Sequence, residues 1–387
     1  MDRSHRTRLW QAVCLAIGLL AISACALTPT AIIPTSAPPV QPTPSTAMVP
    51  SPLPSTISPT SPPNKPPLPA GKNTPTSLAL SPDGTTLAVG TSQGIYAYNV
   101  TSQKQLWFKA SANNPASLTF SQDGSSLFVG AAYPFGSVIQ SLTVLASISG
   151  DVLFQVKTSA DPQGSWSPDG KKLLTSGDCQ EIEVRDALTG KLLHTIQGAT
   201  CNAADPSYMQ AFWSWDGTRI YALLGSKMMG WDASTYKPLA GYAPDLPPFS
   251  TGLSYMVLPS PTEDLIALEN GITVAILDEK TGKTIKSFPG AQPDLPVGNL
   301  AWSPDGKRLA ADFSYGQLVW DVHTGQQTAN LKDYPTPFFS DSTVGRTLAW
   351  LPDNHTLVGL FSANDIMNAV DLDTGKIVFS LPQPVNP

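Results

Sequence analysis

Aspartate is the residue with acid–base or metal-binding chemistry that recurs at regular spacing along this chain. It stands third in a four-residue motif whose clearest copies, at Asp83, Asp169 and Asp305, read Ser-Pro-Asp-Gly. The third positions of the seven copies are residues 83, 123, 169, 216, 262, 305 and 353, which are 40 to 48 residues apart. A carboxylate in such a turn accepts backbone N–H groups two residues further on. The motif therefore predicts one turn cap per unit and no converging catalytic or metal site.

A second position with a recurring aspartate keeps step with the first. It lies 16 to 23 residues after each marker and is held by Asn99, Ala146, Asp186, Asp232, Asp278, Asp321 and Asp371. A Thr-Gly pair ends four residues later, as in Thr189-Gly190 and Thr324-Gly325. We interpret these aspartates as caps of a second set of hairpins. His194, His323 and His355 fall in different units without ligand-like spacing, so we expect no catalytic residue, no metal site and no cofactor.

Each unit has the pattern of four short strands. In the sixth unit, residues 299–302 precede the turn, residues 308–311 follow it, and 318–320 and 328–331 complete the set. Four such strands bury no core alone, but seven sheets packed in a ring do. The sequence thus predicts an all-β fold over residues 75–387, a seven-bladed β-propeller of four-stranded antiparallel blades. Each blade is expected to come from contiguous chain, without exchange of a terminal strand.

Aromatic residues precede the first turn in five units and are expected to pack between blades; they are Phe120, Trp166, Trp213, Trp302 and Trp350. The units resemble WD40 repeats, since Trp231-Asp232 and Val319-Trp320-Asp321 match the signature dipeptide of that family. The resemblance covers about 310 residues and implies a rigid platform for protein partners. The family's Gly-His pair is missing from all seven units, so the hydrogen-bond network that it supports is not expected. The Thr-Gly-Lys turns match quinoprotein-like propellers more weakly.

The first 24 residues have the pattern of an export signal. Residues 1–8 are basic, and residues 9–22 form an apolar run interrupted only by Gln11. Ile22-Ser23-Ala24-Cys25 resembles the lipobox of bacterial lipoproteins, which implies that Cys25 carries the lipid anchor. An uncleaved membrane anchor is the alternative, because residues 9–27 approach the ~20 residues of a spanning helix. Both interpretations place the body on the extracytoplasmic side of a bacterial cell membrane.

Residues 25–74 are expected to form a disordered linker. Of the 38 prolines, 15 lie between residues 29 and 69, and only Lys65 and Lys72 are charged in this segment. The whole chain carries a net charge of -6, and residues 1–24 carry +2, so the remainder carries -6 - 2 = -8. This acidic charge argues against a nucleic-acid partner.

Cysteine use agrees with an oxidising compartment. Cys14 would leave with the signal and Cys25 would be the anchor, which leaves Cys179 and Cys201. Both are expected in connections on one face of the propeller, so a disulfide between them is predicted. Two separate thiols are the alternative.

Candidate partner-binding residues lie in four long connections between units: Tyr208, Tyr242, Asp245, Phe249, Asp294, Asp333, Tyr334, Phe338 and Phe339. Each connection joins an outermost strand to the next innermost one, so all four emerge on one face. Their aromatic residues and aspartates suit a partner of mixed apolar and basic character. In the alternative interpretation, Phe249, Phe338 and Phe339 cap the mouth of the channel.

The sequence as a whole favours a non-catalytic, lipid-anchored platform that binds a protein or another ligand. Two alternatives remain at this stage. One is an extracytoplasmic propeller enzyme, such as a hydrolase, a lyase or a quinoprotein-like enzyme, and the other is a subunit of an envelope assembly complex.

Overall fold

The computed structural model describes residues 75–111, 114–132, 140–158, 164–176, 181–197, 209–224, 227–242, 244, 246, 256–270, 273–289, 297–313, 316–331, 347–361 and 366–381. The predicted signal and linker, residues 1–74, lie outside these residues. The described part consists of strands joined by turns and loops, and it contains no helix long and apolar enough to cross a membrane.

Seven antiparallel sheets form the seven predicted blades, and each contains only strands that are consecutive in sequence. Blade 1 is β1–β4 (Pro75–Leu80, Thr86–Thr91, Gly94–Asn99, Gln105–Ala110) and blade 2 is β5–β8 (Asn114–Phe120, Ser126–Ala132, Gln140–Ala146, Val152–Thr158). Blade 3 is β9–β12 (Gly164–Trp166, Lys172–Ser176, Ile182–Asp186, Leu192–Ile196) and blade 4 is β13–β15 (Met209–Trp213, Arg219–Leu224, Lys227–Asp232). Blade 5 is β16–β19 (Met256–Pro259, Leu265–Glu269, Thr273–Asp278, Thr284–Pro289), blade 6 is β20–β23 (Val297–Trp302, Arg308–Phe313, Gly316–Asp321, Gln327–Leu331) and blade 7 is β24–β27 (Leu348–Trp350, Thr356–Phe361, Ile366–Asp371, Lys376–Leu381).

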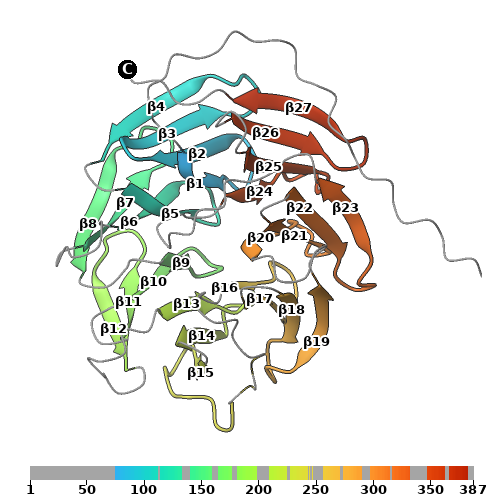
Figure 1. Cartoon of the computed structure of the whole chain (residues 1–387). Helices are drawn as coiled ribbons and strands as arrows, with labels where there is room; N and C mark the ends of the chain where they lie inside the picture. Colours follow the sequence, from blue (N-terminus) through green and yellow to red (C-terminus); the bar gives the residue numbers. More distant parts are fainter. Residues whose placement is uncertain are drawn as a thin grey trace, which may run out of the picture. The chain divides into compact units, whose positions relative to one another are not determined.

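The blades are arranged in a closed ring (Figure 1). The first strand of each blade, which is the innermost, contacts the first strand of the next blade, and β24 contacts β1 to complete the circle. Among the described residues, no strand is exchanged between blade 7 and blade 1, as predicted. Side-chain packing between these two blades joins the first blade to the last.

Blade 4 differs from the predicted pattern because its described residues form only three strands. The place of the fourth strand is taken by an isolated bridge between Trp231 and Pro238 and by a hydrogen bond from the Leu239 amide to the Gly230 carbonyl. Proline has no N–H group to donate to a ladder. Pro238 therefore interrupts the edge where the other six blades continue a regular strand.

The core is divided into seven apolar clusters, and each one lies between two neighbouring blades. Between blades 7 and 1, for example, Leu78 and Tyr96 pack with Met367 and Leu381. The two faces of every sheet thus contribute to two different clusters. No blade holds a core of its own, which is the expectation for a repeat of four short strands.

Candidate functional site

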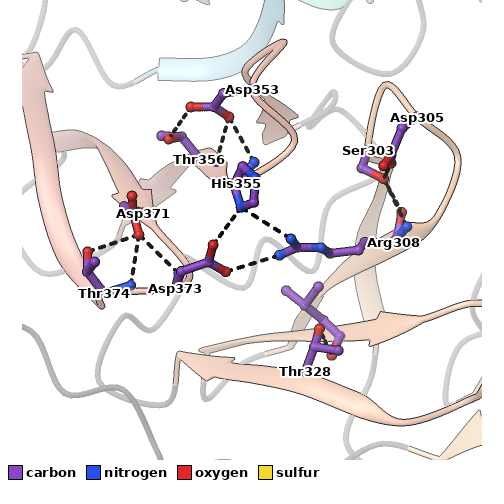
Figure 2. Close-up of polar contacts among 11 residues, drawn as sticks. Ser303, Asp305, Arg308, Thr328, Asp353, His355, Thr356, Asp371, Asp373 and Thr374 are labelled. Atoms are coloured by element: carbon purple, nitrogen blue, oxygen red, sulfur yellow. Dashed lines mark hydrogen bonds and ion pairs between the residues drawn. The ribbon is translucent and has the colours of Figure 1, made fainter.

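The turn between the first two strands of a blade, here called the inner turn, is capped by its aspartate. In blade 6 the Ser303 hydroxyl donates to Asp305 Oδ1 at 2.7 Å, and the Lys307 amide donates to the same oxygen at 3.1 Å. The Arg308 amide donates in turn to Ser303 Oγ at 2.9 Å (Figure 2). The same serine–aspartate contact recurs at Asp83, Asp123, Asp169 and Asp216. The predicted role as a turn cap is confirmed.

The turn between the third and fourth strands, here called the outer turn, is capped in a similar way. In blade 7 the Thr374 amide and hydroxyl donate to Asp371 Oδ1 at 2.8 Å and 2.9 Å. Asp186, Asp232, Asp278 and Asp321 accept equivalent bonds. Since the strands alternate in direction, inner and outer turns lie at the same end of every blade. We call this end of the ring the turn face and the opposite end the loop face.

These caps keep the repeated carboxylates ionised. The Ser81 hydroxyl and the Thr85 amide hold the pKa of Asp83 below its usual range. At Asp232, hydrogen bonds from Ser234 and Thr235 lower the pKa to about 2. A carboxylate that is ionised at neutral pH and already bonded to backbone amides is a poor general acid or base. The repeated aspartates therefore serve the turns.

Tryptophan side chains fasten neighbouring blades, as the sequence predicts. The indole N–H of Trp350 donates to the Ala301 carbonyl of blade 6 at 2.9 Å. Trp166, Trp213 and Trp302 donate in the same way, at 3.0 to 3.2 Å, to the innermost strand of the preceding blade. Each of these bonds ties an indole to the backbone of the neighbouring blade. The five aromatic positions are thus packing positions.

One exposed corner on the turn face combines a histidine with a carboxylate. His355 Nδ1 lies 2.6 Å from Asp373 Oδ2, and Arg308 Nη1 lies 3.6 Å from Asp373 Oδ1 (Figure 2). Arg308 Nη2 also lies 3.3 Å from His355 Nδ1, so the three side chains form one polar cluster. No serine, threonine or cysteine side chain contacts the imidazole among the described residues. The corner therefore joins β21 of blade 6 to both turns of blade 7.

Two buried carboxyl groups were not predicted from the sequence. Glu279, 1% exposed, follows β18 and has no hydrogen-bond partner for either carboxylate oxygen within the described residues. Burial, with the negative charges of Asp264 and Asp216, raises the pKa of Glu279 to about 7. The other outer turns have an uncharged residue at this position: Val100, Ser147, Ala187, Ala233, Val322 and Leu372. Glu279 therefore stands out in the sequence only when the outer turns of all seven units are aligned.

Asp312, 2% exposed, lies near the loop-face end of β21. Thr347 donates to its Oδ2 at 2.5 Å, Asn299 donates to the Thr347 hydroxyl at 3.0 Å, and Gln317 also hydrogen-bonds the carboxyl group. Burial raises the pKa of Asp312 to about 7 against these bonds. Like Glu279, this group is closed off from solvent and from any dissolved substrate.

Of the candidate partner-binding residues, the structure describes Tyr242 alone. Its ring packs 5.2 Å from that of Tyr221 between blades 4 and 5, and its hydroxyl is buried. Tyr242 is thus partly buried and packs against the apolar cluster between blades 4 and 5. The other candidates lie outside the described residues: Tyr208, Asp245, Phe249, Asp294, Asp333, Tyr334, Phe338 and Phe339, with the predicted anchor Cys25 and the predicted disulfide pair Cys179 and Cys201. Across the described ranges, no three His, Cys, Asp or Glu residues gather as metal ligands.

Comparisons with known proteins agree with this architecture. Residues 257–339 match the family model of the anaphase-promoting complex subunit 4 WD40 domain. A WD repeat-containing protein, WDS homolog, of Arabidopsis thaliana is 26% identical over 177 residues, which are 41% of this chain and 29% of that protein. The chain thus spans less than a third of the length of this curated relative.

Three solved structures share the fold at low identity. The β-propeller domain of Myceliophteria thermophila Cps50 (Swd1) has a TM-score of 0.63 at 12% identity, over 78% of this chain and 96% of that one. Kuenenia stuttgartiensis hydrazine synthase has a TM-score of 0.58 at 17% identity, over 77% and 96%. A chain of the mitotic checkpoint complex has a TM-score of 0.56 at 18% identity, over 75% and 87%. With the seven in-phase units and the closed ring, these matches show a seven-bladed β-propeller fold, of which residues 257–339 are similar to a WD40 domain.

Proposed function

We propose that this chain is a lipid-anchored protein of the extracytoplasmic membrane surface whose propeller is a non-catalytic platform for protein partners. The observation that best supports the platform role is that the repeated ionisable side chains act as turn caps. Those described in the turns cap backbone amides, one turn at a time around the ring. What remains is a rigid scaffold that holds loops in fixed positions, and functional residues of such scaffolds sit mainly on loops.

The printed names of similar proteins support this proposal. The family model and one of the structural neighbours come from multiprotein complexes. WD40 propellers are commonly interaction scaffolds. A role as a subunit of an envelope assembly complex would be one form of the same platform function.

An enzymatic role is the rival, and the hydrazine synthase neighbour is the observation that favours it. That likeness, at 17% identity, extends to the fold alone. The described residues supply two carboxyl groups with raised pKa values, Glu279 and Asp312, but both are buried. The exposed His355–Asp373 pair lacks a nucleophile.

The anchor rests on the tetrapeptide Ile22-Ser23-Ala24-Cys25 and the apolar run before it. Growth with a labelled fatty acid tests it. We expect label on the wild type and on Cys14→Ser, and none on Cys25→Ser. Label retained by Cys25→Ser, or none on the wild type, would contradict the lipoprotein assignment and favour the uncleaved anchor.

The platform role can be tested through its loops. In crosslinked intact cells, changing Tyr334, Phe338 and Phe339 together to serine should abolish partner capture and leave the thermal midpoint nearly unchanged. The matched control is Trp215→Ser, which changes an exposed aromatic residue on the turn face and should retain partner capture. If the triple variant instead unfolds several degrees earlier, those rings belong to the core and the loops are not the binding site.

A further inference from the structure

The outer turns of blades 2 and 3 carry exposed aliphatic side chains at a position that is polar in the other five blades. The second residue after the capping position is Thr101, Ile148, Leu188, Ser234, Lys280, His323 or Asp373 in blades 1 to 7. Ile148 is 88% exposed and Leu188 is 74% exposed. Seven equivalent turns in one molecule show that the fold does not require an aliphatic residue there. Exposed apolar groups that the fold does not need mark interaction surfaces when they gather.

They do gather, because the strands that follow these two turns begin with further exposed aliphatic residues. Val152 and Leu153 open β8, Leu192 and Leu193 open β12, and each of the four is 43 to 48% exposed. The two hairpins are neighbours: a Cβ atom on Gly190 of blade 3 would come within 2.4 Å of the Phe154 ring in β8. Figure 1 shows β8 and β12 as successive outermost strands. We call these residues the aliphatic ridge: Ile148, Val152, Leu153, Leu188, Leu192 and Leu193.

The two ends of the aliphatic ridge differ in charge. The blade 2 end carries Asp151 in the outer turn and Asp123 in the inner turn. The two turns are adjacent, because the Ser147 amide of the outer turn donates to the Ser125 carbonyl of the inner turn. These turns contain no lysine or arginine, so their charge is -2. The blade 3 turns, with the strand residues that flank them, carry three lysines against two aspartates, a charge of +3 - 2 = +1: Lys171, Lys172, Lys191, Asp169 and Asp186. A surface with an acidic end, an apolar middle and a basic end is complementary to its own copy.

We propose that the aliphatic ridge is a self-association site that binds the ridge of a second copy of this chain around a twofold axis. In a twofold contact the same patch meets itself, so blade 2 of one copy faces blade 3 of the other. Aliphatic side chains then cover aliphatic side chains, and the acidic end of each copy meets the basic end of its partner. Charge complementarity of this kind fixes the orientation of a contact.

Charge and size favour a second copy over the other occupants. A flat membrane would have to approach the turn face, where ionised carboxylates such as Asp123 and Asp169 are held by their turns. Six aliphatic residues are fewer than the roughly 20–30 residues per side of a standard stable interface, so the contact should be a weak, reversible one. This inference is independent of the lipid anchor, because it needs only the propeller.

Light scattering on the purified full chain in detergent, over a concentration series, tests the inference. We expect a concentration-dependent shift from one copy to two. Ile148→Ser with Leu188→Ser should weaken association by roughly a hundredfold, since two buried aliphatic side chains are lost from the contact. The matched control, Ile285→Ser with Val378→Ser, removes two exposed aliphatic residues from blades 5 and 7 and should leave association unchanged. A monomer at every concentration, or equal effects of both pairs, would overturn the proposal.

Charge reversal tests the twofold orientation. Asp151→Lys and Lys191→Asp should each weaken association, and the two changes together should restore it, because the acidic and basic ends then exchange places. A double variant weaker than both single variants would reject the orientation. A photo-crosslinker at residue 188 should give a product of twice the protein mass. A product with lipid or with another protein in its place would show that the ridge has a different occupant.

Failure of this inference and failure of the proposed function can be told apart. Fatty-acid labelling and partner capture report on the anchor and on the loop face. Light scattering and the residue 188 crosslink report on the aliphatic ridge alone. A labelled protein that captures a partner but stays monomeric would overturn self-association only.

Discussion

Glu279 should make the stability of this propeller depend on pH. Neither of its carboxylate oxygens has a hydrogen-bond partner among the described residues, and Asp264 and Asp216 lie near it. Burial raises the pKa from its ordinary value of 4.5 to about 7. The unfolded chain therefore loses this proton at a lower pH than the folded chain does. The stability of the fold falls as the pH rises from about 4.5 to about 7, and the loss is complete above pH 7.

The magnitude follows from the shift. A difference of about 2.5 pKa units corresponds to about 3 kcal/mol, and we expect about 2 kcal/mol after allowance for water and for the Arg219 charge. For a body of about 310 residues, this is a change of about 3 °C in Tm. Glu279→Gln should thus raise the Tm by about 3 °C at pH 8 and hardly change it at pH 4.5. Glu279→Ala, which matches blades 3 and 4, should do the same.

The assay is tryptophan fluorescence during heating, at half-unit steps from pH 4.5 to pH 8. Glu263→Gln is a matched control, because Glu263 lies near the same turn but is partly exposed and pairs with His323 at 3.3 Å. Its Tm profile should follow that of the wild type. If Glu279→Gln lowers the Tm at pH 8, or keeps the wild-type slope, then the carboxylate has a stabilising partner and this reasoning is wrong.

Three further predictions concern other parts of the ring. Trp350→Phe removes the indole donor to the Ala301 carbonyl and should lower the free energy of unfolding by about 1–3 kcal/mol, measured by urea unfolding. Trp215→Phe, at an exposed position, should lower it much less. Equal losses in the two variants would show that the Trp350 indole does not stabilise the contact between blades. Asp312→Asn should flatten the remaining fall in Tm between pH 5 and pH 7, since burial raises the pKa of Asp312 to about 7; an unchanged slope would show that another group titrates there. Thiol titration of the denatured, unreduced protein should find Cys179 and Cys201 joined, and two free thiols would end the disulfide proposal.

The sequence predicted the features that repeat. Capping aspartates, packing tryptophans and contiguous blades each leave a mark in several units, and the repetition separates that mark from chance. Features that occur once were harder to predict. Glu279 and Asp312 show no local motif, and their raised pKa values depend on burial between blades that only the ring creates. Pro238 is visible in the sequence, but its effect on blade 4 appears only once the fourth strand of the other blades is known.

The candidate partner loops show a case in which a visible sequence feature did not distinguish two roles. Tyr242 was selected for its place in a long connection, yet its ring is held by Tyr221 in the core between blades 4 and 5. An aromatic residue beside prolines fits a binding loop and a packing loop equally well, because both bury aromatic area. The aliphatic ridge was missed because Ile148 and Leu188 stand out only when the seven outer turns are compared position by position.

The absence of strand exchange between blades 7 and 1 has a consequence for how the gene of such a protein can be rearranged. Every ladder between described strands lies within one stretch of chain, so the order of the blades in the sequence is independent of this strand pairing. A circular permutant that joins the end of β27 to the start of β1, and opens the chain before β13, would keep all the strand ladders and all seven apolar clusters. Such a rearrangement moves the first strand of the propeller from one side of the ring to the other.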